Sequence, residues 1–474
     1  MAWRDHRYAA RRRRLRLRPL LPDPGRRHDR RRTAARRKEP PLASRPGAGA
    51  THRASADRDV IPIIPLASSS AEDFLRGVPP APTAAGSGLA APPPLALYVH
   101  WPWCVKKCPY CDFNSHESHR TLGEDSEAAY LAALIGDLEA ALPRIWNRPV
   151  VSVFIGGGTP SLMRGETVEA LLAAIRMRVP LHPGAEITLE ANPGTADAAK
   201  FAAFRAAGVN RLSIGVQSFD DAKLVALGRI HDSAEAHRAI ELALRNFERV
   251  NLDLMYALPQ QTLAEARQDI TTAIRTGVSH LSAYHLTLEP NTPFHHAPPP
   301  LPDDDLAADM QEMVEALLGA AGFDHYETSA FAKPASGTDE RCRHNLNYWT
   351  FGDYLGIGAG AHSKLSNHET IWREARHRNP RAYLQGATRG DFTSTRQSIA
   401  RADLPGEFMM NALRLNAGFA PRLFVERTGL PLAVIEGPGL AARRAGLLET
   451  VDGYIRPTPL GRRFLNQLLA GFLA

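Results

Sequence analysis

The sequence contains little cysteine and no long apolar stretch. Only four of its 474 residues are cysteine, which excludes a small scaffold held together by disulfides. A membrane span needs about 18 or more consecutive apolar residues, and the chain has no such run. Residues 1–60 also lack the apolar stretch of a secretory signal. We therefore expect a soluble, cytoplasmic protein without stable membrane insertion.

Acidic residues are scarce at the start of the chain. Residues 1–60 hold 19 Lys and Arg against 6 Asp and Glu, whereas the other 414 residues hold 38 basic and 44 acidic side chains. A segment with so much positive charge and so few apolar residues cannot build a core. We therefore expect a disordered extension, or a start codon placed too far upstream. Contact with nucleic acid or anionic lipid is the alternative. Because Pro, Ala, Gly and Ser dominate the residues that follow, we assign 1–94 to a basic tail and a linker.

Apolar runs typical of strands alternate with amphipathic helical stretches across residues 95–330. The expected strands are Ala96–His100, Val150–Gly156, Glu186–Asn192, Arg211–Gln217, Val250–Leu258, His280–Glu289 and Asp324–Phe331. The expected helices lie near residues 126–142, 165–178, 196–207, 233–246, 262–276 and 303–321. Six strand–helix units predict an α/β fold with a parallel sheet, either a partial barrel or an open doubly wound sheet. In both, the chemistry lies at the carboxyl ends of the strands.

The character of the sequence changes after residue 400. Residues 331–400 read as a connecting region, and 401–474 as a smaller helical domain. Leu447–Thr450 and Gly453–Arg456 predict a short hairpin, and Gly437-Pro438-Gly439 predicts a break between two helices. Helices with a small hairpin resemble a winged-helix module. No basic face is concentrated there, so we interpret the module as a docking domain rather than a DNA-binding one.

Three of the four cysteines lie within eight residues. Cys104, Cys108 and Cys111 are separated by three and then two residues, on a loop after the first expected strand. Clustered thiols suit zinc or an iron–sulfur cluster. A structural zinc site usually has four ligands, and Cys342 is far away in the sequence. Three thiolates would instead leave one iron of a cubane without a protein ligand, so that a small molecule could bind there.

A glycine run closes the second expected strand. Gly156, Gly157 and Gly158 precede Thr159-Pro160, and by itself such a run predicts only a tight turn with exposed N–H donors. Together with the CxxxCxxC spacing, it resembles the radical S-adenosylmethionine (SAM) superfamily. The resemblance implies a partial (β/α)6 barrel of TIM type, a [4Fe–4S] cluster on the three cysteines, and SAM chelated to the free iron. It also implies electron transfer from the cluster into the sulfonium of SAM.

Polar residues occupy the expected strands where a purely apolar core would have none. Glu190, Gln217 and Asp253 each lie in or at the end of an apolar strand, where an unpaired polar group is costly. They form either a buried hydrogen-bond network or part of a ligand site, and Arg229 either pairs with a carboxylate or is solvated. Over residues 95–474 the chain resembles the subgroup of oxygen-independent coproporphyrinogen III dehydrogenases and haem chaperones. That resemblance implies a SAM site lined by Tyr98, Tyr110, Gly157, Gly158, Thr159, Glu190, Gln217, Arg229, Asp253 and His285.

Two features favour the chaperones within this subgroup. Phe113 stands where the dehydrogenases continue their signature with a further cysteine. Residues 344–349 read HNLNYW, which resembles the HNxxYW motif associated with haem binding in the chaperones. The resemblance implies haem binding by His344, Asn345, Tyr348 and Trp349.

The residue types in this segment suit haem. Imidazole is a good axial ligand of haem iron, aromatic rings offer flat apolar surface, and Arg341 or Arg343 could pair with a propionate. Cys342 is either an alternative ligand or a small buried residue. Without the resemblance, the segment would read as a packed loop. The glycine-rich residues 354–362 lack the context of a nucleotide site, so we expect close backbone packing near the cofactor.

The resemblance implies a protein that binds haem, a [4Fe–4S] cluster and SAM, and that transfers haem to acceptor haemoproteins. It implies an electron donor such as flavodoxin or ferredoxin, and we expect no nucleic-acid partner. One alternative is an enzyme that decarboxylates coproporphyrinogen III oxidatively in haem biosynthesis. Another is nucleic-acid binding through the basic tail and the C-terminal module. Deletion of residues 1–90 would separate that function from haem and SAM binding.

Overall fold

The computed structural model describes residues 88–118, 123–145, 147–334 and 339–473. The predicted basic tail and most of the predicted linker lie outside these residues. Leu89 is buried, and its N–H donates a hydrogen bond to the carbonyl of His368 at 2.8 Å. The chain is therefore anchored several residues before the first strand begins.

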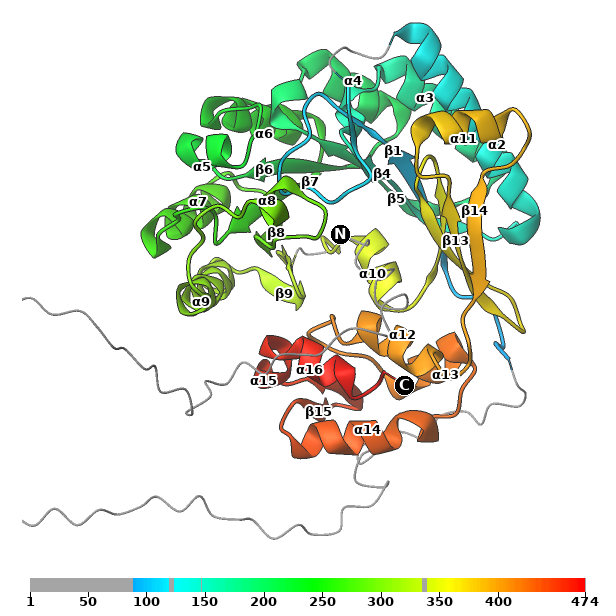
Figure 1. Ribbon diagram of the computed structural model, residues 1–474, viewed down its shortest axis with the longest axis vertical. Coiled ribbons are helices and arrows are strands. Elements are labelled where there is room, and N and C mark those ends of the chain that lie inside the picture. The colour runs from blue at the N-terminus through cyan, green and yellow to red at the C-terminus, as the bar shows by residue number, and fades with distance from the viewer. Residues whose placement is uncertain (1–87, 119–122, 146, 335–338, 474) are drawn as a thin grey trace, which may run out of the picture. The chain divides into compact units, whose positions relative to one another are not determined.

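Six strands alternate with six helices, and the helices lie outside the sheet (Figure 1). The strands are β1 (Leu95–Trp101), β4 (Val150–Gly157), β5 (Leu181–Ala191), β6 (Arg211–Gln217), β7 (Arg249–Tyr256) and β8 (His280–His285). The helices are α2 (Glu124–Ile145), α3 (Gly165–Arg178), α4 (Ala198–Ala207), α6 (Ser233–Asn246), α7 (Leu263–Arg275) and α9 (Asp304–Ala320). Successive parallel strands are neighbours, without the reversal of order that marks a doubly wound sheet. The predicted partial (β/α)6 barrel is confirmed, and the doubly wound alternative is wrong.

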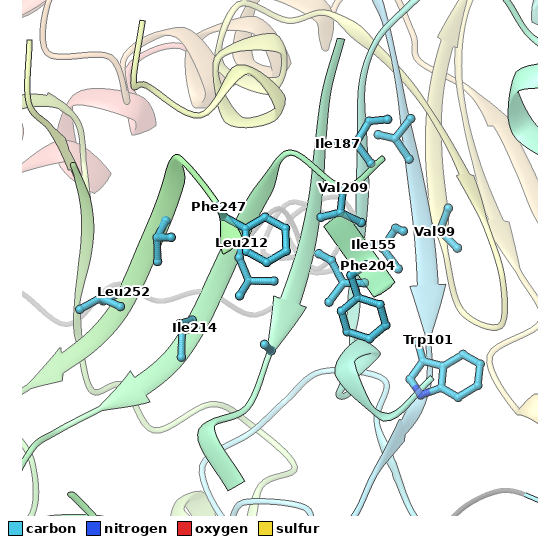
Figure 2. Close-up of a cluster of buried hydrophobic side chains, with 14 of the residues drawn as sticks. Val99, Trp101, Ile155, Ile187, Phe204, Val209, Leu212, Ile214, Phe247 and Leu252 are labelled. Atoms are coloured by element: carbon cyan, nitrogen blue, oxygen red, sulfur yellow. The ribbon is translucent and has the colours of Figure 1, made fainter. Parts of the chain in front are cut away.

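Alternation along each strand separates an apolar face from a polar one. On β1, Leu97 and Val99 pack against the helices, so Tyr98 and His100 point the other way. Figure 2 shows the apolar layer with Val99, Trp101, Ile155, Ile187, Phe204, Val209, Leu212, Ile214, Phe247 and Leu252 labelled. The residues between them on the strands face the interior of the barrel. This is why polar residues can lie in these strands without entering the apolar core.

Four further strands extend the sheet beyond β1. They are β11 (Asp353–Ile357), parallel to β1, and the antiparallel β12 (His362–Ser366), β13 (Ile371–Arg376) and β14 (Thr393–Ser398). The sequence indicates only a connecting region here, because β14 is a largely exposed edge strand without apolar alternation.

The other edge of the sheet corrects an expected strand. Instead of one strand over Asp324–Phe331, β9 (Asp324–Glu327) and β10 (Ala330–Ala332) form an antiparallel hairpin. The chain turns at Thr328, whose N–H donates to the carbonyl of Arg414 at 3.1 Å. The shorter helices α5 (Asp221–Ala226), α8 (Pro293–His296) and α11 (Pro380–Ala387) lie in connections. In the part of the chain that the structure describes, no helix is long and apolar enough to cross a membrane.

The C-terminal module has its own apolar core. It consists of α12 (Leu404–Ala412), α13 (Pro421–Thr428), α14 (Ala433–Arg444), β15 (Leu448–Val451), β16 (Tyr454–Pro457), α15 (Pro459–Arg463) and α16 (Leu465–Ala470). The rings of Phe408 and Phe419 pack edge to face with centroids 5.0 Å apart. The predicted hairpin is confirmed. The predicted break at Gly437-Pro438-Gly439 is wrong, because α14 continues through it and buries Ile435 and Ala442 on either side.

A buried ion cluster ties β13 to α2. Arg376 is 1% exposed, and its guanidinium donates to Asp137 Oδ1 at 2.7 Å and to Glu374 Oε2 at 3.1 Å. Asp137 also accepts hydrogen bonds from the Tyr383 hydroxyl at 3.0 Å and from the N–H of Gly358 at 3.1 Å. The cluster therefore joins the added antiparallel strands to the first helix of the barrel.

We expect Arg376→Met to lower the free energy of unfolding by about 3–5 kcal/mol, because it leaves two buried carboxylates without their shared cation. Arg396→Met is the matched control. The Arg396 side chain is 52% exposed and also pairs with Glu374, so its loss should cost less than about 1 kcal/mol. Urea unfolding measures both values, and equal losses would contradict the role given to Arg376.

Candidate metal centre

The three clustered cysteines lie on one loop that short strands close. After β1, Cys104 ends the short strand β2 (Trp103–Cys104), which pairs in parallel with β3 (His116–Glu117), and the loop with Cys108 and Cys111 joins these two strands. The Lys107 ammonium donates to the carbonyls of Phe113 at 2.9 Å and Ser115 at 3.0 Å. The loop backbone is thus held in shape by contacts within the loop itself.

The thiols of this loop have polar neighbours. Arg229 Nη1 donates to Cys108 Sγ at 3.6 Å, and Cys111 Sγ lies 3.7 Å from Ser115 Oγ. Burial raises the pKa of the Cys104 thiol to about 11, so this thiol is protonated at neutral pH and must lose its proton to bind iron. The positive charge of Arg229 lies where it stabilises a thiolate.

The glycine run at the end of β4 packs on the backbone that leads into the cysteine loop. The N–H of Thr159 donates to the carbonyl of Trp103 at 2.8 Å. A Cβ at Gly157, where φ is +115°, would lie 2.5 Å from the His100 ring, and one at Gly158 would lie 2.5 Å from the Trp103 carbonyl oxygen. The close packing of Gly157 on the His100 ring of β1, and of Gly158 on the backbone before the cysteine loop, therefore requires glycine at both positions.

Two of the predicted SAM residues meet over Gly215 on β6. Arg229 Nη2 donates to the Gly215 carbonyl at 2.7 Å while Nη1 reaches Cys108. Gln217 has a φ of +69°, which is rare for a residue with a side chain. Its Nε2 lies 3.0 Å from the position of a Cβ at Gly215. The amide and the guanidinium are thus brought together beside the cysteine loop.

Glu190 and Asp253 are neighbouring half-buried carboxylates on the inner face of the sheet. Burial raises the pKa of Glu190 to about 7, and the charge of Asp253 adds to the rise. Glu190 Oε2 accepts the N–H of Gly157 at 3.0 Å. Asp253 accepts the hydroxyls of Ser213 at 2.9 Å and Tyr284 at 3.2 Å. Both carboxylates therefore have partners within the barrel and remain partly exposed toward the site.

Tyr110 belongs to this group as well. It is on the cysteine loop, where its hydroxyl interacts with Arg229 and Cys108 and its ring packs in a small apolar cluster. Two other predicted SAM residues lie apart. His285 ends β8, where it is exposed and its ring centroid lies 5.6 Å from that of Tyr256. Tyr98 lies deeper, in the middle of β1, and its hydroxyl is hydrogen-bonded to His100 Nδ1 at 2.9 Å.

The predicted haem residues lie on a short helix, α10 (Arg343–Trp349), near the amino ends of the strands. His344 is 3% exposed, and its Nδ1 lies 3.3 Å from the hydroxyl of Ser152, close to the start of β4. Its ring centroid lies 4.9 Å from that of Phe154 and 6.4 Å from that of Tyr98. The structure thus groups His344 with Tyr98 rather than with the cysteine loop.

The other predicted haem residues differ in how far packing contacts bury them. Tyr348 stacks on Tyr354 with ring centroids 4.2 Å apart. Trp349 lies under the guanidinium of Arg414 at 4.4 Å, and both aromatic residues are buried. Asn345 is half-buried. Flat aromatic surface is therefore present but covered in this conformation.

Comparison with known proteins identifies the family. The family model described as Radical SAM superfamily matches residues 98–273, and that described as HemN C-terminal domain matches residues 399–464. Heme chaperone HemW of Escherichia coli (strain K12) is 48% identical over 388 residues, which are 81% of this chain and 99% of that protein. The Haemophilus influenzae HemW is 45% identical, over 80% of this chain and 98% of its own. The chain belongs to the HemW family.

A solved structure supports the fold of this HemW-family chain. Coproporphyrinogen III oxidase (HemN) from Escherichia coli, a radical SAM enzyme, has a TM-score of 0.68 and covers 81% of this chain and 91% of its own. Its sequence identity is 22%, so the likeness concerns the fold alone. As a radical SAM protein, the chain uses a [4Fe–4S] cluster and SAM.

The cysteine loop fits such a cluster. In a cubane each thiolate binds a different iron atom, and the chain presents three thiols on one short loop beside the cation of Arg229. A single ion needs ligands that converge on one point. Within the described residues, no three His, Cys, Asp or Glu side chains do so.

Sequence reasoning missed Glu186, which caps α10 in this member of the HemW family. Its carboxylate accepts the N–H of Arg343 at 3.2 Å and that of His344 at 3.3 Å. Arg249 Nη2 pairs with it at 2.9 Å, and the buried Cys342 thiol donates to it at 3.5 Å. The available signal was its position four residues before the predicted carboxylate ligand on the same strand, which places both on the inward face.

Sequence reasoning also missed Asn114, which joins the cysteine loop to the glycine-rich turn after β11. Its Nδ2 donates to the carbonyls of Ala359 and Arg378, each at 2.9 Å, and its own carbonyl is hydrogen-bonded to His100 Nε2 at 3.0 Å. A Cβ at Gly360, where φ is +76°, would lie 2.3 Å from Asn114 Nδ2. The close backbone packing expected of the glycine-rich segment is confirmed.

We expect Gly360→Ala to displace Asn114 and to reduce the amount of cluster that the protein retains. Gly277→Ala is the matched control, since φ is +83° there but no atom lies within 4 Å of the added Cβ. Each substitution places a side chain in left-handed backbone at a cost of about 1–2 kcal/mol. Only Gly360→Ala should also lower iron and acid-labile sulfide per protein after anaerobic reconstitution. The same loss of cluster in both variants would argue against a role for Asn114.

Proposed function

We propose that this chain is a haem chaperone that binds haem and transfers it to acceptor haemoproteins. The observation that carries the proposal is the match to proteins named heme chaperone HemW, at up to 48% identity over nearly their whole length. Haem is the cargo in this function, and the cluster and SAM are resident cofactors. Nucleic acid has no part in it. The domain boundaries near residues 330 and 400 stay predictions.

We assign the cluster to Cys104, Cys108 and Cys111, and SAM to the polar group beside them. When bound, the cluster supplies an electron to SAM, received from a donor such as flavodoxin or ferredoxin. The chain's own part is to hold the charges in place. The guanidinium of Arg229 donates a hydrogen bond to Cys108 Sγ. The carboxylate of Glu190 is held by the N–H of Gly157 in the glycine turn. Tyr98 and His285 lie apart from this group and stay predictions.

We assign the haem iron to His344. Burial lowers the pKa of His344 to about 3, so its imidazole is neutral and keeps a lone pair for iron. Phe154 and Tyr348 cover the ring, with centroids 4.9 and 5.1 Å away. Haem can reach the ring only if α10 moves. This helix has seven residues and depends on Glu186 at its amino end.

The competing function is the oxidative decarboxylation of coproporphyrinogen III. The HemN-like fold is shared with such an enzyme, whereas Phe113 occupies the place of its further cysteine. We expect anaerobic incubation with reductant, SAM and coproporphyrinogen III to yield no protoporphyrinogen IX. The haem-loaded protein should instead transfer haem to an apo-haemoprotein, measured by the Soret band of the acceptor. Formation of protoporphyrinogen IX would overturn the chaperone proposal.

We expect His344→Ala to weaken haem binding by at least about tenfold and to shift the Soret band, because it removes an iron ligand. Added imidazole should restore the spectrum by filling the vacated position. His280→Ala is the control, since His280 is also a buried histidine inside the barrel but has no assigned contact with iron. An unchanged Soret band in His344→Ala would remove His344 from the role.

A further inference from the structure

One buried cation inside the barrel is not used by the cluster or SAM assignments. Arg211 begins β6, where Leu212 and Ile214 belong to the apolar layer (Figure 2). Alternation therefore directs Arg211 and Ser213 to the interior. Arg211 is 2% exposed. It lies beside Arg249 in the register of β6 and β7.

Arg211 lacks the carboxylate partners that the half-buried Arg249 and the buried Arg376 have. Among the residues that the structure describes, none forms a hydrogen bond or an ion pair with its guanidinium. Arg249, in contrast, pairs with Glu186 at 2.9 Å, and Arg376 pairs with two carboxylates. An unpaired charge is among the most costly groups to bury. An arginine in this state is suited to a ligand that brings a negative charge.

The nearby acidic groups are already engaged. Glu186 accepts two backbone N–H groups, a thiol and the guanidinium of Arg249. Asp253 accepts hydrogen bonds from Ser213, Asn251 and Tyr284. Both carboxylates act on Arg211 through their charge, which helps to raise the pKa of its guanidinium, and not through a hydrogen bond.

The other titratable neighbours add no negative charge. Burial lowers the pKa of His280 and His344 and raises those of Cys342 and Tyr326. All four side chains are therefore neutral at pH 7. Glu186 is paired with Arg249, and Asp253 accepts hydrogen bonds from three other side chains, so neither carboxylate supplies a direct partner for the guanidinium of Arg211.

We infer that Arg211 binds a carboxylate of the ligand inside the barrel, and that a haem propionate is this carboxylate. The inference rests on the proposed function. A guanidinium presents a fork of donors that matches a carboxylate with two hydrogen bonds. Arg211 lies near His344, whose pKa its charge helps to lower, so both residues belong to the same end of the interior.

The two arginines expected from the sequence are less suitable. Arg341 pairs with Asp339 at 2.8 Å, and both are substantially exposed. Arg343 donates to the carbonyl of Gly184. Each therefore has a partner outside the barrel interior.

The carboxylate of SAM is the other possible source of this chemistry. Along β6, however, Arg211 pairs in register with Thr188, two positions below the Ser213–Glu190 pair. The residues assigned to SAM begin at that upper level and continue to Gln217 and Arg229. Arg211 is thus nearer the helix that carries the haem candidates than the cysteine loop.

The test compares haem with haem dimethyl ester, in which both propionates lose their charge. We expect the wild-type protein to bind haem about 10- to 100-fold more tightly than the ester, the range of one charge-assisted hydrogen-bonded pair. In Arg211→Met this difference should disappear, while Arg211→Lys should keep part of it. SAM affinity should be unchanged in both. Absorbance titrations measure all the dissociation constants.

Thermal unfolding separates a binding role from a structural one. If Arg211 were needed to balance Glu186, Arg211→Met would lower Tm, whereas an unpartnered cation can be replaced without loss. The inference would be overturned if Arg211→Met still preferred haem over the ester. It would also be overturned if Arg341→Met lost this preference while Arg211→Met kept it, or if Arg211→Met weakened SAM binding. Equal binding of haem and ester by the wild type would overturn it as well. A wild-type protein that binds no haem would refute the proposed function itself.

Discussion

Many side chains inside this barrel are polar, and most of them are paired with other groups of the protein. An unpaired polar group in such a place costs free energy, which explains the dense pairing around Glu186 and Asp253. The apolar layer between sheet and helices supplies the hydrophobic stabilisation on the other face (Figure 2). Because folding does not depend on an apolar interior, the interior is available for cofactors and cargo.

Two segments border this interior, and each depends on residues far away in the sequence. The cysteine loop is held by Asn114 to Ala359, which follows it by 245 residues. At the other end, α10 is capped by Glu186 from β5, more than 150 residues earlier. The region after residue 330 therefore builds both ends of the site, although the repeated strands and helices end before it.

The sequence predicts the repeated part well because its signals are local. Strand β6 and helices α3 and α6 have the bounds that their apolar periodicity indicates. Sequence patterns fail to predict an element where contacts with distant parts of the chain determine its conformation. The edge strand β14 has no apolar face, and α14 continues through Pro438 because its buried residues hold it to the core.

The site shows the same division. The cysteine spacing and the glycine run are short motifs, so sequence can find them. Their residues do lie together, because Thr159 bonds to the backbone beside Cys104. A motif does not show, however, at which end of the barrel a strand residue lies. Tyr98 lies next to His344 instead of the cysteine loop. The pairing of Glu186 and the lack of a partner for Arg211 are properties of the folded barrel alone.

The central claim is that three thiolates hold a cubane whose fourth iron is open to SAM at the carboxyl ends of the strands. The most direct measurement is electron paramagnetic resonance of the anaerobically reconstituted, reduced protein during titration with SAM. The account predicts the signal of a reduced [4Fe–4S] cluster and a change in its g-values that is complete at one SAM per cluster. A signal that SAM leaves unaltered, or a protein that takes up zinc and no sulfide, would contradict it.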